Sequence, residues 1–238
     1  MKIKILYSHL NVSGTDNKAR PQWFDFEKCY RNFLNSTLYA LDDDIDIKFH
    51  VVYDETRGKV EQNWINNWKQ TFVLHEIQGG SMFDAAKEMY RIAKELSSDM
   101  EDTDLFYFVE NDYLHVSGWV DKVKDLFESF KGLNYVSLYD HNDKYFAPDY
   151  EELVSKIFAT STSHWRTTPS TCGSYICTKK LFLEDYDVHT GTEGDHNKWL
   201  YLAETKNRFL LTPIPGLSTH CMEGLLSPTI NWKQINNK

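Results

Sequence analysis

The chain has 238 residues, a formal net charge of −9, 41% hydrophobic residues and 15% aromatic residues. This composition predicts a globular protein with a sizeable core and excludes a disordered chain. The acidic balance argues against a broad surface for nucleic acid or for an anionic membrane. We expect one domain and no nucleic-acid partner.

The cysteines and the first residues indicate the compartment. Cys29, Cys172, Cys177 and Cys221 have neither the paired spacing of a zinc site nor the density of a disulfide framework. The chain opens directly with a strand-like pattern, and no apolar run approaches the length of a membrane span. We therefore expect a soluble cytoplasmic protein with reduced thiols and no transmembrane segment.

In the first part of the chain, expected strands and helices alternate, which is typical of a parallel sheet covered by helices. Gly79 and Gly80 form a turn before one of these helices, and Ser81 is its expected N-cap. The glycines let backbone approach a ligand, although a plain tight turn explains them as well. The expected strands cover residues 2–8, 45–53 and 71–77, and the expected helices cover residues 23–41, 59–70 and 82–96.

The next strand organises the chain. Residues 105–109 form an apolar and aromatic run that predicts a strand buried on both faces. Glu110, Asn111 and Asp112 follow it directly, at the edge where open α/β sheets bind ligands. Two carboxylates there suit Mg²⁺ or Mn²⁺, and the cation would suit a diphosphate. A solvated acidic turn is the alternative.

The second part of the chain predicts further elements around a long polar excursion, where substrate loops tend to lie. Glu193 and Asp195 stand at the head of one expected helix, either as a functional pair or simply as acids favoured at a helix N-terminus. The expected helices cover residues 118–130, 151–158 and 196–204, and the expected strands cover residues 135–138, 170–178 and 209–211.

Taken together, this order of parts resembles the GT-A fold of nucleotide-sugar-dependent glycosyltransferases, most nearly the inverting family 2 type. The resemblance covers nearly the whole chain. Its motifs are the helix from Phe26, the strand end Val51–Glu55, the turn Gly79–Ser81, the strand and acids of Leu105–Asp112 in place of Asp-x-Asp, the acidic motif Glu193–Asp195 and the late His220.

The resemblance implies an α/β fold with a Rossmann-like mixed sheet and helices on both faces. It also implies a nucleotide-sugar-binding half over residues 1–115 and an acceptor-binding half over residues 116–238. The implied reaction moves a sugar from a nucleoside-diphosphate sugar, a UDP-sugar first, to a hydroxyl of a glycan or glycoconjugate, with inversion.

The resemblance also assigns the catalytic and metal-binding residues. Glu110, Asp112 and His220 would hold Mn²⁺, or alternatively Mg²⁺, on the diphosphate. Asp195 is the expected base for the acceptor hydroxyl, and Glu193 is the second choice. The first acid of the metal motif is Glu rather than Asp, and Gly194 separates the usual adjacent acid pair.

Donor-binding residues follow from the same comparison. Asp54 would accept hydrogen bonds from the base or ribose, and Gly80 and Asn111 would line the donor site. Tyr7 would stack on the base, or it lies in the core. His164, Trp165, Arg166 and Trp199 are candidate walls of the sugar and acceptor sites, and residues 221–232 form either a lid or a loose end.

Two other functions stay open. A sugar nucleotidyltransferase would need a glycine-rich phosphate loop after the first strand, and residues 8–20 offer one glycine, Lys18 and Arg20. A catalytically inactive nucleotide-sugar or carbohydrate-binding module of the same fold would explain the altered acids at Glu110 and Gly194. Binding without product formation would identify such a module.

Overall fold

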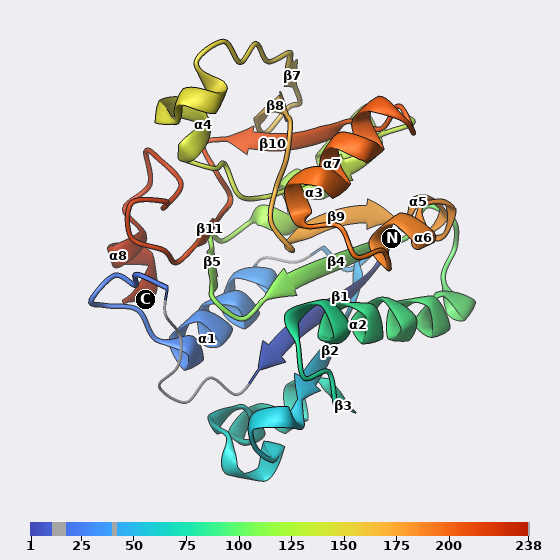
Figure 1. Cartoon of the computed structure of the whole chain (residues 1–238), viewed down its shortest axis with the longest axis vertical. Coiled ribbons are helices and arrows are strands. Elements are labelled where there is room, and N and C mark those ends of the chain that lie inside the picture. Colours follow the sequence, from blue (N-terminus) through green and yellow to red (C-terminus); the bar gives the residue numbers. More distant parts are fainter. Residues whose placement is uncertain (11–17, 40–41, 238) are drawn as a thin grey trace.

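The computed structural model describes residues 1–10, 18–39 and 42–237 (Figure 1). In these residues one sheet runs in the order β3-β2-β1-β4-β9-β6-β10-β8-β7, and β11 pairs with β5 in a separate ribbon. The strands are β1 (Lys2–Leu10), β2 (Asp46–Asp54), β3 (Val73–Ile77), β4 (Leu105–Glu110), β5 (Tyr113–His115), β6 (Tyr135–Val136), β7 (Ile157–Ala159), β8 (His164–Thr168), β9 (Tyr175–Thr178), β10 (Leu210–Ile214) and β11 (Ser218–His220).

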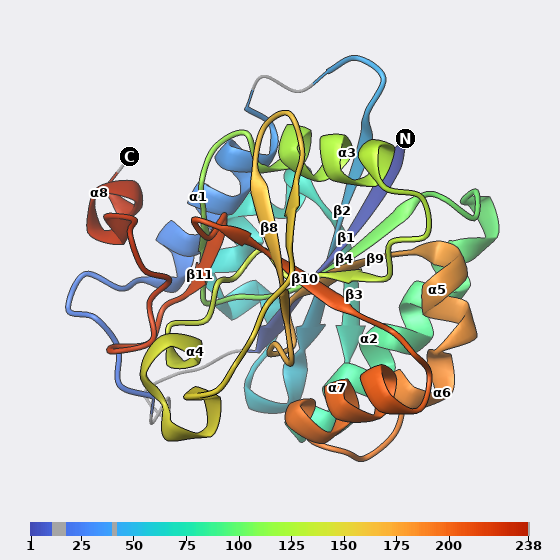
Figure 2. The ribbon, with the colours of Figure 1, turned by 90° about the horizontal axis from the view of Figure 1, so that it is seen from above.

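Helices cover both faces of this sheet, as the view from above shows (Figure 2). One face carries α1 and α3, and the other carries α2, α5, α6 and α7. The helices are α1 (Phe26–Thr37), α2 (Met82–Leu96), α3 (Trp119–Ser129), α4 (Asp143–Phe146), α5 (Lys179–Glu184), α6 (Tyr186–His189), α7 (Asp195–Glu204) and α8 (Trp232–Asn236). None of these helices has the length and apolar character needed to cross a membrane.

The parallel part of the sheet sets the position of the site. Strand β1 pairs in parallel with both β2 and β4, and β2 pairs in parallel with β3. The register puts Ser8 opposite Glu110 and Leu10 opposite Asp54, so three carboxyl ends meet at one edge. That edge is the ligand-binding edge of an open α/β sheet.

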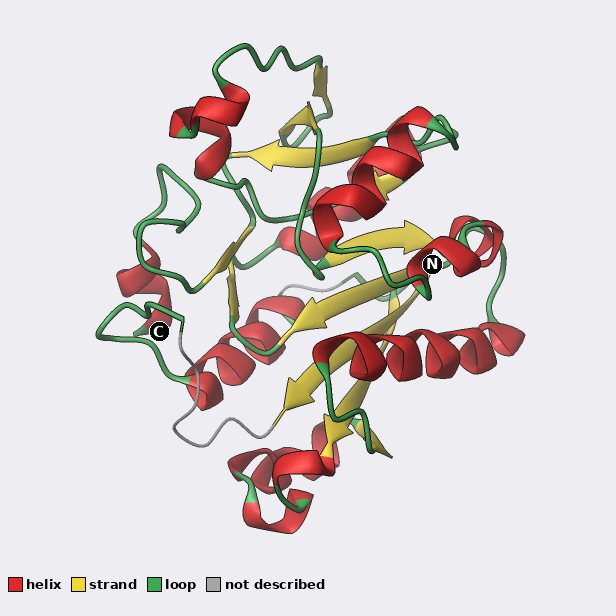
Figure 3. Cartoon of the chain, in the orientation of Figure 1, coloured by secondary structure: helices red, strands yellow, loops and turns green. Residues whose placement is uncertain are grey.

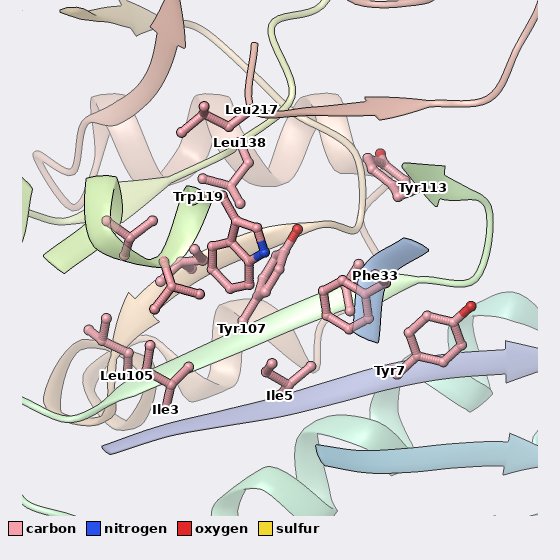
Figure 4. Packing of buried hydrophobic residues seen from close by; sticks show 14 of the residues in the cluster. Ile3, Ile5, Tyr7, Phe33, Leu105, Tyr107, Tyr113, Trp119, Leu138 and Leu217 are labelled. Atoms are coloured by element: carbon pink, nitrogen blue, oxygen red, sulfur yellow. The ribbon is translucent and has the colours of Figure 1, made fainter. Parts of the chain in front are cut away.

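Alternating side chains of the central strands divide the core into two layers. In β4, Tyr107 packs with the residues of α1 and α3, whereas Phe106 and Phe108 pack with those of α2 and α5. Figure 4 shows the first layer, where Tyr107 lies against Trp119 with ring centroids 5.2 Å apart. The prediction of a strand buried on both faces is confirmed.

Two predicted helices are absent from the described residues. Residues 59–70 form 3₁₀ turns, η2 (Val60–Gln62) and η3 (Trp64–Thr71), after the turn η1 (Glu55–Arg57). Asn63 interrupts the segment, because its side chain accepts a hydrogen bond from the backbone N–H of Ile65. Such local side-chain bonds compete with helix formation.

The predicted helix over residues 151–158 is wrong as well. After the short η5 turn (Pro148–Tyr150) the chain becomes extended, and β7 pairs with β8, which in turn pairs with β10. Figure 3 shows how much loop surrounds these strands. Pairing with the sheet edge overrides the weak helical spacing of this segment.

The C-terminal segment is docked rather than loose. Trp232 is buried at the start of α8, in a cluster with Cys29 of α1 and Leu114 of β5. Its indole N–H donates a hydrogen bond to the Ser227 carbonyl at 2.7 Å. The alternative of a loose end is therefore wrong.

Candidate active site

The ribbon of β5 and β11 brings Asp112 and His220 together although 108 residues separate them. Asp112 directly precedes β5 and His220 is the last residue of β11, and the antiparallel register pairs His220 with Tyr113. As a result, Nε2 of His220 lies 2.9 Å from Oδ2 of Asp112. The backbone N–H of Cys221 also donates to the Asp112 carbonyl at 2.9 Å, which fixes the pair.

Three nitrogen atoms lie within hydrogen-bond distance of one oxygen of Asp112, a residue that is only 2% exposed. Its Oδ2 lies 2.8 Å from Arg20 Nη2, 2.9 Å from His220 Nε2 and 3.1 Å from Lys18 Nζ. Burial would raise the pKa of Asp112, but His220, Lys18 and Arg20 hold it well below its usual range. Asp112 is therefore an anion, and its buried Oδ1 has no hydrogen-bond partner among the described residues.

Lys18 places an ammonium group between two potential metal ligands. Its Nζ lies 3.1 Å from Asp112 Oδ2 and 3.2 Å from His220 Nε2. Nε2 has one proton or one lone pair, so it cannot donate to Asp112 and accept from Lys18 at once. A divalent cation would use the imidazole lone pair and the carboxylate together. Asp112 and His220 thus offer two donor atoms of the kinds that a divalent cation uses, and in this structure the Lys18 ammonium lies between them.

Glu110 lies apart from this pair. Its Oε2 is buried without a hydrogen-bond partner among the described residues, and a Cβ on Gly173 would stand 3.3 Å from its carboxyl carbon. Burial and the charge of Asp112 raise the pKa of Glu110. Within the described ranges no three His, Cys, Asp or Glu residues are grouped to hold a metal ion. The structure therefore brings together Asp112 and His220 of the three predicted ligands.

Asp54 fastens the end of β2 to the turn before α2. Its Oδ1 accepts backbone N–H groups of Thr56 at 2.9 Å and Gly79 at 3.2 Å, and its Oδ2 accepts that of Gly80 at 3.2 Å. Gly80 has a φ of +76°, a conformation that favours glycine. The predicted turn and its two glycines are thus held by Asp54.

Two cavities meet at Glu110. The first, of about 280 Å³, runs along the carboxyl ends of the parallel strands, and the second, of about 120 Å³, lies toward α7. Both are lined by Glu110, Ser8 and Met82. Of the other predicted residues, the first cavity has Asp54, Gly80, Asn111 and Asp112, and the second has Glu193 and Asp195.

The first cavity is lined by as many cations as acids, although the chain has a net charge of −9. Lys18, Arg20 and Arg57 line it together with three acids, Asp54, Glu110 and Asp112. An anionic ligand would therefore find cationic side chains in this cavity.

Asp195 begins α7 and has a cationic neighbour one turn later. Its Oδ1 accepts a hydrogen bond from Lys198 Nζ at 2.8 Å, and Lys198 is itself buried against the second cavity. Glu193 is exposed and accepts from Asn197 Nδ2 at 3.4 Å. Sequence reasoning missed Lys198, although the spacing of Asp195 and Lys198 by three residues in a helix was a usable signal.

Tyr7 does not line the first cavity, and the expected stacking on a base is wrong. Tyr7 is 1% exposed, and its ring packs in the core against Tyr30 and Phe33, with centroids 5.1 and 5.7 Å away. Figure 4 shows the Tyr7 and Phe33 rings in this core. The Tyr7 hydroxyl donates to the Asn111 carbonyl at 3.2 Å. Asn111 also contacts the His9 ring, with its Nδ2 3.0 Å from His9 Nδ1. Tyr7 therefore supports the loop that carries Asn111.

Of the four residues proposed as sugar or acceptor walls, Trp165, Arg166 and Trp199 are buried, whereas His164 is exposed at the start of β8. Trp165 and Trp199 belong to the two layers of the core. Arg166 donates from Nη2 to Asp140 Oδ1 at 2.7 Å, and both side chains are buried. For Trp165 and Arg166 the expected contact with substrate is wrong, because aromatic and basic character alone does not separate a cavity wall from a core position. Trp199 also lines a third cavity, of about 120 Å³, so its contact with substrate stays a prediction, as does that of His164.

No protein-family model and no curated protein sequence matches this chain. Solved structures do share its architecture. Residues 1–349 of S. aureus TarS align with a TM-score of 0.50 at 10% identity, covering 89% of this chain and 58% of TarS 1–349. The same part of TarS in complex with UDP gives 0.51 at 11% identity, covering 89% and 57%. Mouse xyloside xylosyltransferase 1 aligns at 0.44 and 6% identity, covering 88% and 84%.

The chain thus spans less than two thirds of TarS 1–349. At this level of identity the likeness shows a common fold, and the predicted GT-A-like α/β class is confirmed. The division into a donor half before residue 115 and an acceptor half after it stays a prediction.

Proposed function

We propose that this chain is a glycosyltransferase that moves a sugar from a UDP-sugar to a hydroxyl of a glycan or glycoconjugate. One observation carries the proposal: Glu110 joins two cavities, of which the first contains cations and the second contains the acids at the head of α7. A donor and an acceptor need two adjoining spaces of this kind, so that the reacting atoms meet.

The nucleoside diphosphate would occupy the first cavity. Asp54 and Gly80 would contact the nucleoside, and Asn111 and Asp112 would lie toward the diphosphate. The fold shared with TarS, which has been crystallised with UDP, supports this choice of donor. The cations Lys18, Arg20 and Arg57 would balance the charge of the diphosphate.

Asp112 and His220 would hold a divalent cation, Mn²⁺ or Mg²⁺. When bound, the cation would act as a Lewis acid that neutralises charge on the departing diphosphate. Support comes from Oδ1 of Asp112, which has no partner in the part of the chain that the structure describes, and from the ammonium that already lies against both ligands. A site with a carboxylate and an imidazole favours Mn²⁺ over Mg²⁺.

Asp195 would accept the proton of the acceptor hydroxyl as its oxygen attacks the sugar carbon. Inversion then follows, because the attacking oxygen and the departing phosphate lie on opposite sides of that carbon. Lys198 would orient the Asp195 carboxylate through their 2.8 Å hydrogen bond. Glu193, in the same cavity, is the alternative base.

Calorimetric titration of UDP, with Mn²⁺ and separately with EDTA, tests the donor site. We expect binding in Mn²⁺ that EDTA abolishes. Asp112→Asn should weaken UDP binding in Mn²⁺ by at least about a hundredfold, because it removes a ligand charge. Asp43→Asn is the matched control, since Asp43 is an exposed acid outside both cavities and should leave binding unchanged.

A second step tests turnover. The protein is incubated with a panel of UDP-sugars, and released UDP is measured with and without glycan acceptors. Release that needs both Mn²⁺ and Asp112 supports the transferase. Tight UDP binding with no release from any donor would favour a binding module, and equal binding in EDTA would remove the metal role.

A further inference from the structure

Lys18 occupies the place where the proposed cation and diphosphate would meet. Its Nζ contacts both Asp112 and His220, at 3.1 and 3.2 Å. Its side chain is 41% exposed and lines the first cavity, whereas the Asp112 side chain is 3% exposed. The ammonium therefore approaches a buried acid from the open side of the cavity.

Arg20 is bound to the same acid in a different way. Its Nη2 donates to Asp112 at 2.8 Å, its Nη1 donates to the Cys221 carbonyl at 2.9 Å, and its guanidinium lies 4.5 Å from the ring centroid of Phe24. Its side chain is 14% exposed. Arg20 thus ties Asp112 to the segment after β11 and forms part of the wall of the site.

A cation that binds Asp112 and His220 must compete with Lys18. The two positive charges would repel each other strongly within a few ångströms, and His220 Nε2 cannot serve both. A diphosphate in the same cavity would give the displaced ammonium a new anionic partner.

From this geometry we propose that Lys18 is an exchangeable internal cation of the donor site. Without ligand it neutralises Asp112 and keeps the metal position occupied. When the metal and the nucleoside diphosphate bind, Lys18 leaves Asp112 and binds the diphosphate. This inference rests on the proposed function and names a residue that couples metal binding to donor binding.

The exchange predicts that replacing Lys18 changes the affinities for Mn²⁺ and for UDP in opposite directions. In Lys18→Met, Mn²⁺ alone should bind about tenfold more tightly, because the competing ammonium is gone and every molecule is ready for the metal. UDP in saturating Mn²⁺ should bind about tenfold more weakly, because a charge-assisted hydrogen bond to the diphosphate is lost. A residue that only stabilises the site would weaken both affinities when replaced.

The measurements are Mn²⁺ titration followed by electron paramagnetic resonance of the free ion, and calorimetric titration of UDP at saturating Mn²⁺. The wild type, Lys18→Met, Lys18→Arg and Lys124→Met are compared. Lys124 is a matched control, because it is also ion-paired, to Asp42 and Asp44, but lies outside both cavities. Lys18→Arg should keep UDP binding within about threefold, since it retains the charge.

Tighter Mn²⁺ together with weaker UDP in Lys18→Met supports the exchange. If Lys18→Met weakens both affinities, or changes neither, the exchange is wrong while UDP binding by the wild type leaves the proposed function intact. If the wild type binds no UDP at saturating Mn²⁺, the proposed function fails first and the exchange falls with it. The wild-type titration therefore separates the two failures.

Discussion

Gly79 lies so close to Asp54 that a methyl group at position 79 would stand 2.7 Å from Asp54 Oδ2. The same methyl group would stand 2.8 Å from the backbone of Ala85 in α2. Neither neighbour is the free end of a flexible side chain, because Asp54 is fixed by backbone N–H groups and Ala85 by its helix. Asp54 and Ala85, which both line the first cavity, can thus keep their positions only because residue 79 has no side chain.

We expect Gly79→Ala to weaken UDP binding by about tenfold or more, because the added methyl group must displace Asp54 or α2. Calorimetric titration of UDP in Mn²⁺ measures the effect. Gly132→Ala is the control for general damage, because Gly132 has a φ of +82° and open space around it, away from both cavities. It should cost stability and leave UDP binding unchanged; equal UDP affinity in both variants would contradict the role of Asp54.

Asp195→Asn should lower kcat by about 10² to 10⁴-fold and leave UDP affinity within about threefold, because the variant loses a proton acceptor and no donor contact. The readout is UDP release at saturating donor and acceptor. Glu193→Gln is the companion variant, and it should cost less than about tenfold if Asp195 is the base.

The buried ion pair makes a stability control necessary for Asp195→Asn. Replacing Asp195 leaves the ammonium of Lys198, which is 6% exposed, without its carboxylate. Thermal unfolding of Asp195→Asn and of the double variant Asp195→Asn with Lys198→Met separates folding from chemistry. A larger loss of kcat in Glu193→Gln than in Asp195→Asn would transfer the role of base to Glu193.

Stability should fall below neutral pH because His115 is buried without charge. Burial lowers the pKa of His115 from 6.5 to about 3. Between pH 6.5 and about pH 3 the unfolded chain therefore binds more protons than the folded chain. The stability that neutral His115 contributes is complete above pH 6.5 and is lost as the pH falls. The expected slope is about 1.4 kcal/mol per pH unit for this residue.

Urea denaturation at several pH values between 7 and 4 measures this slope. His115→Gln cannot protonate, and its free energy of unfolding should fall less steeply with decreasing pH than that of the wild type. His196→Gln replaces an exposed histidine and should keep the wild-type slope. Identical slopes in all three proteins would show that His115 is not kept neutral by the fold.

Trp232→Ala should lower the free energy of unfolding by about 3–5 kcal/mol, the range for truncating a buried tryptophan. Its indole is 2% exposed and hydrogen-bonded to the Ser227 carbonyl. Phe146→Ala, at an aromatic residue that is 62% exposed, should cost less than about 1 kcal/mol. If urea denaturation showed only a small loss of unfolding free energy in Trp232→Ala, α8 would not be docked and the C-terminal segment would be loose.

Sequence patterns predicted the parallel half of the fold well because each element there has a strong local signal. The apolar run of residues 105–109 matches β4, and the N-cap Ser81 with its amphipathic helix matches α2 at both ends. The segment from residue 144 to residue 168 has only weak local signals. Its strand β8 pairs with β10, more than forty residues away along the chain, and β7 pairs with β8; periodicity cannot show the long-range pairing.

The candidate site divides in the same way. Carboxylates at or just beyond the end of a strand, such as Asp54 and Asp112, are placed by that strand, and both line the first cavity. Lys18 comes from a loop with no periodic pattern, so its contact with His220 depends on tertiary structure. Tyr7 and Trp165 show the converse error, because an aromatic residue in a strand has the same sequence signature in the core as in a cavity.

The ribbon of β5 and β11 has a consequence for how the protein matures. Because Asp112 and His220 are held by a pairing across 108 residues, the site cannot exist until the middle and the last part of the chain have both folded. A fragment that ends before β11 would lack one side of the pair, and a one-residue slip of the ribbon would turn His220 to its other face. Metal binding at Asp112 and His220 would therefore report completed folding of the chain.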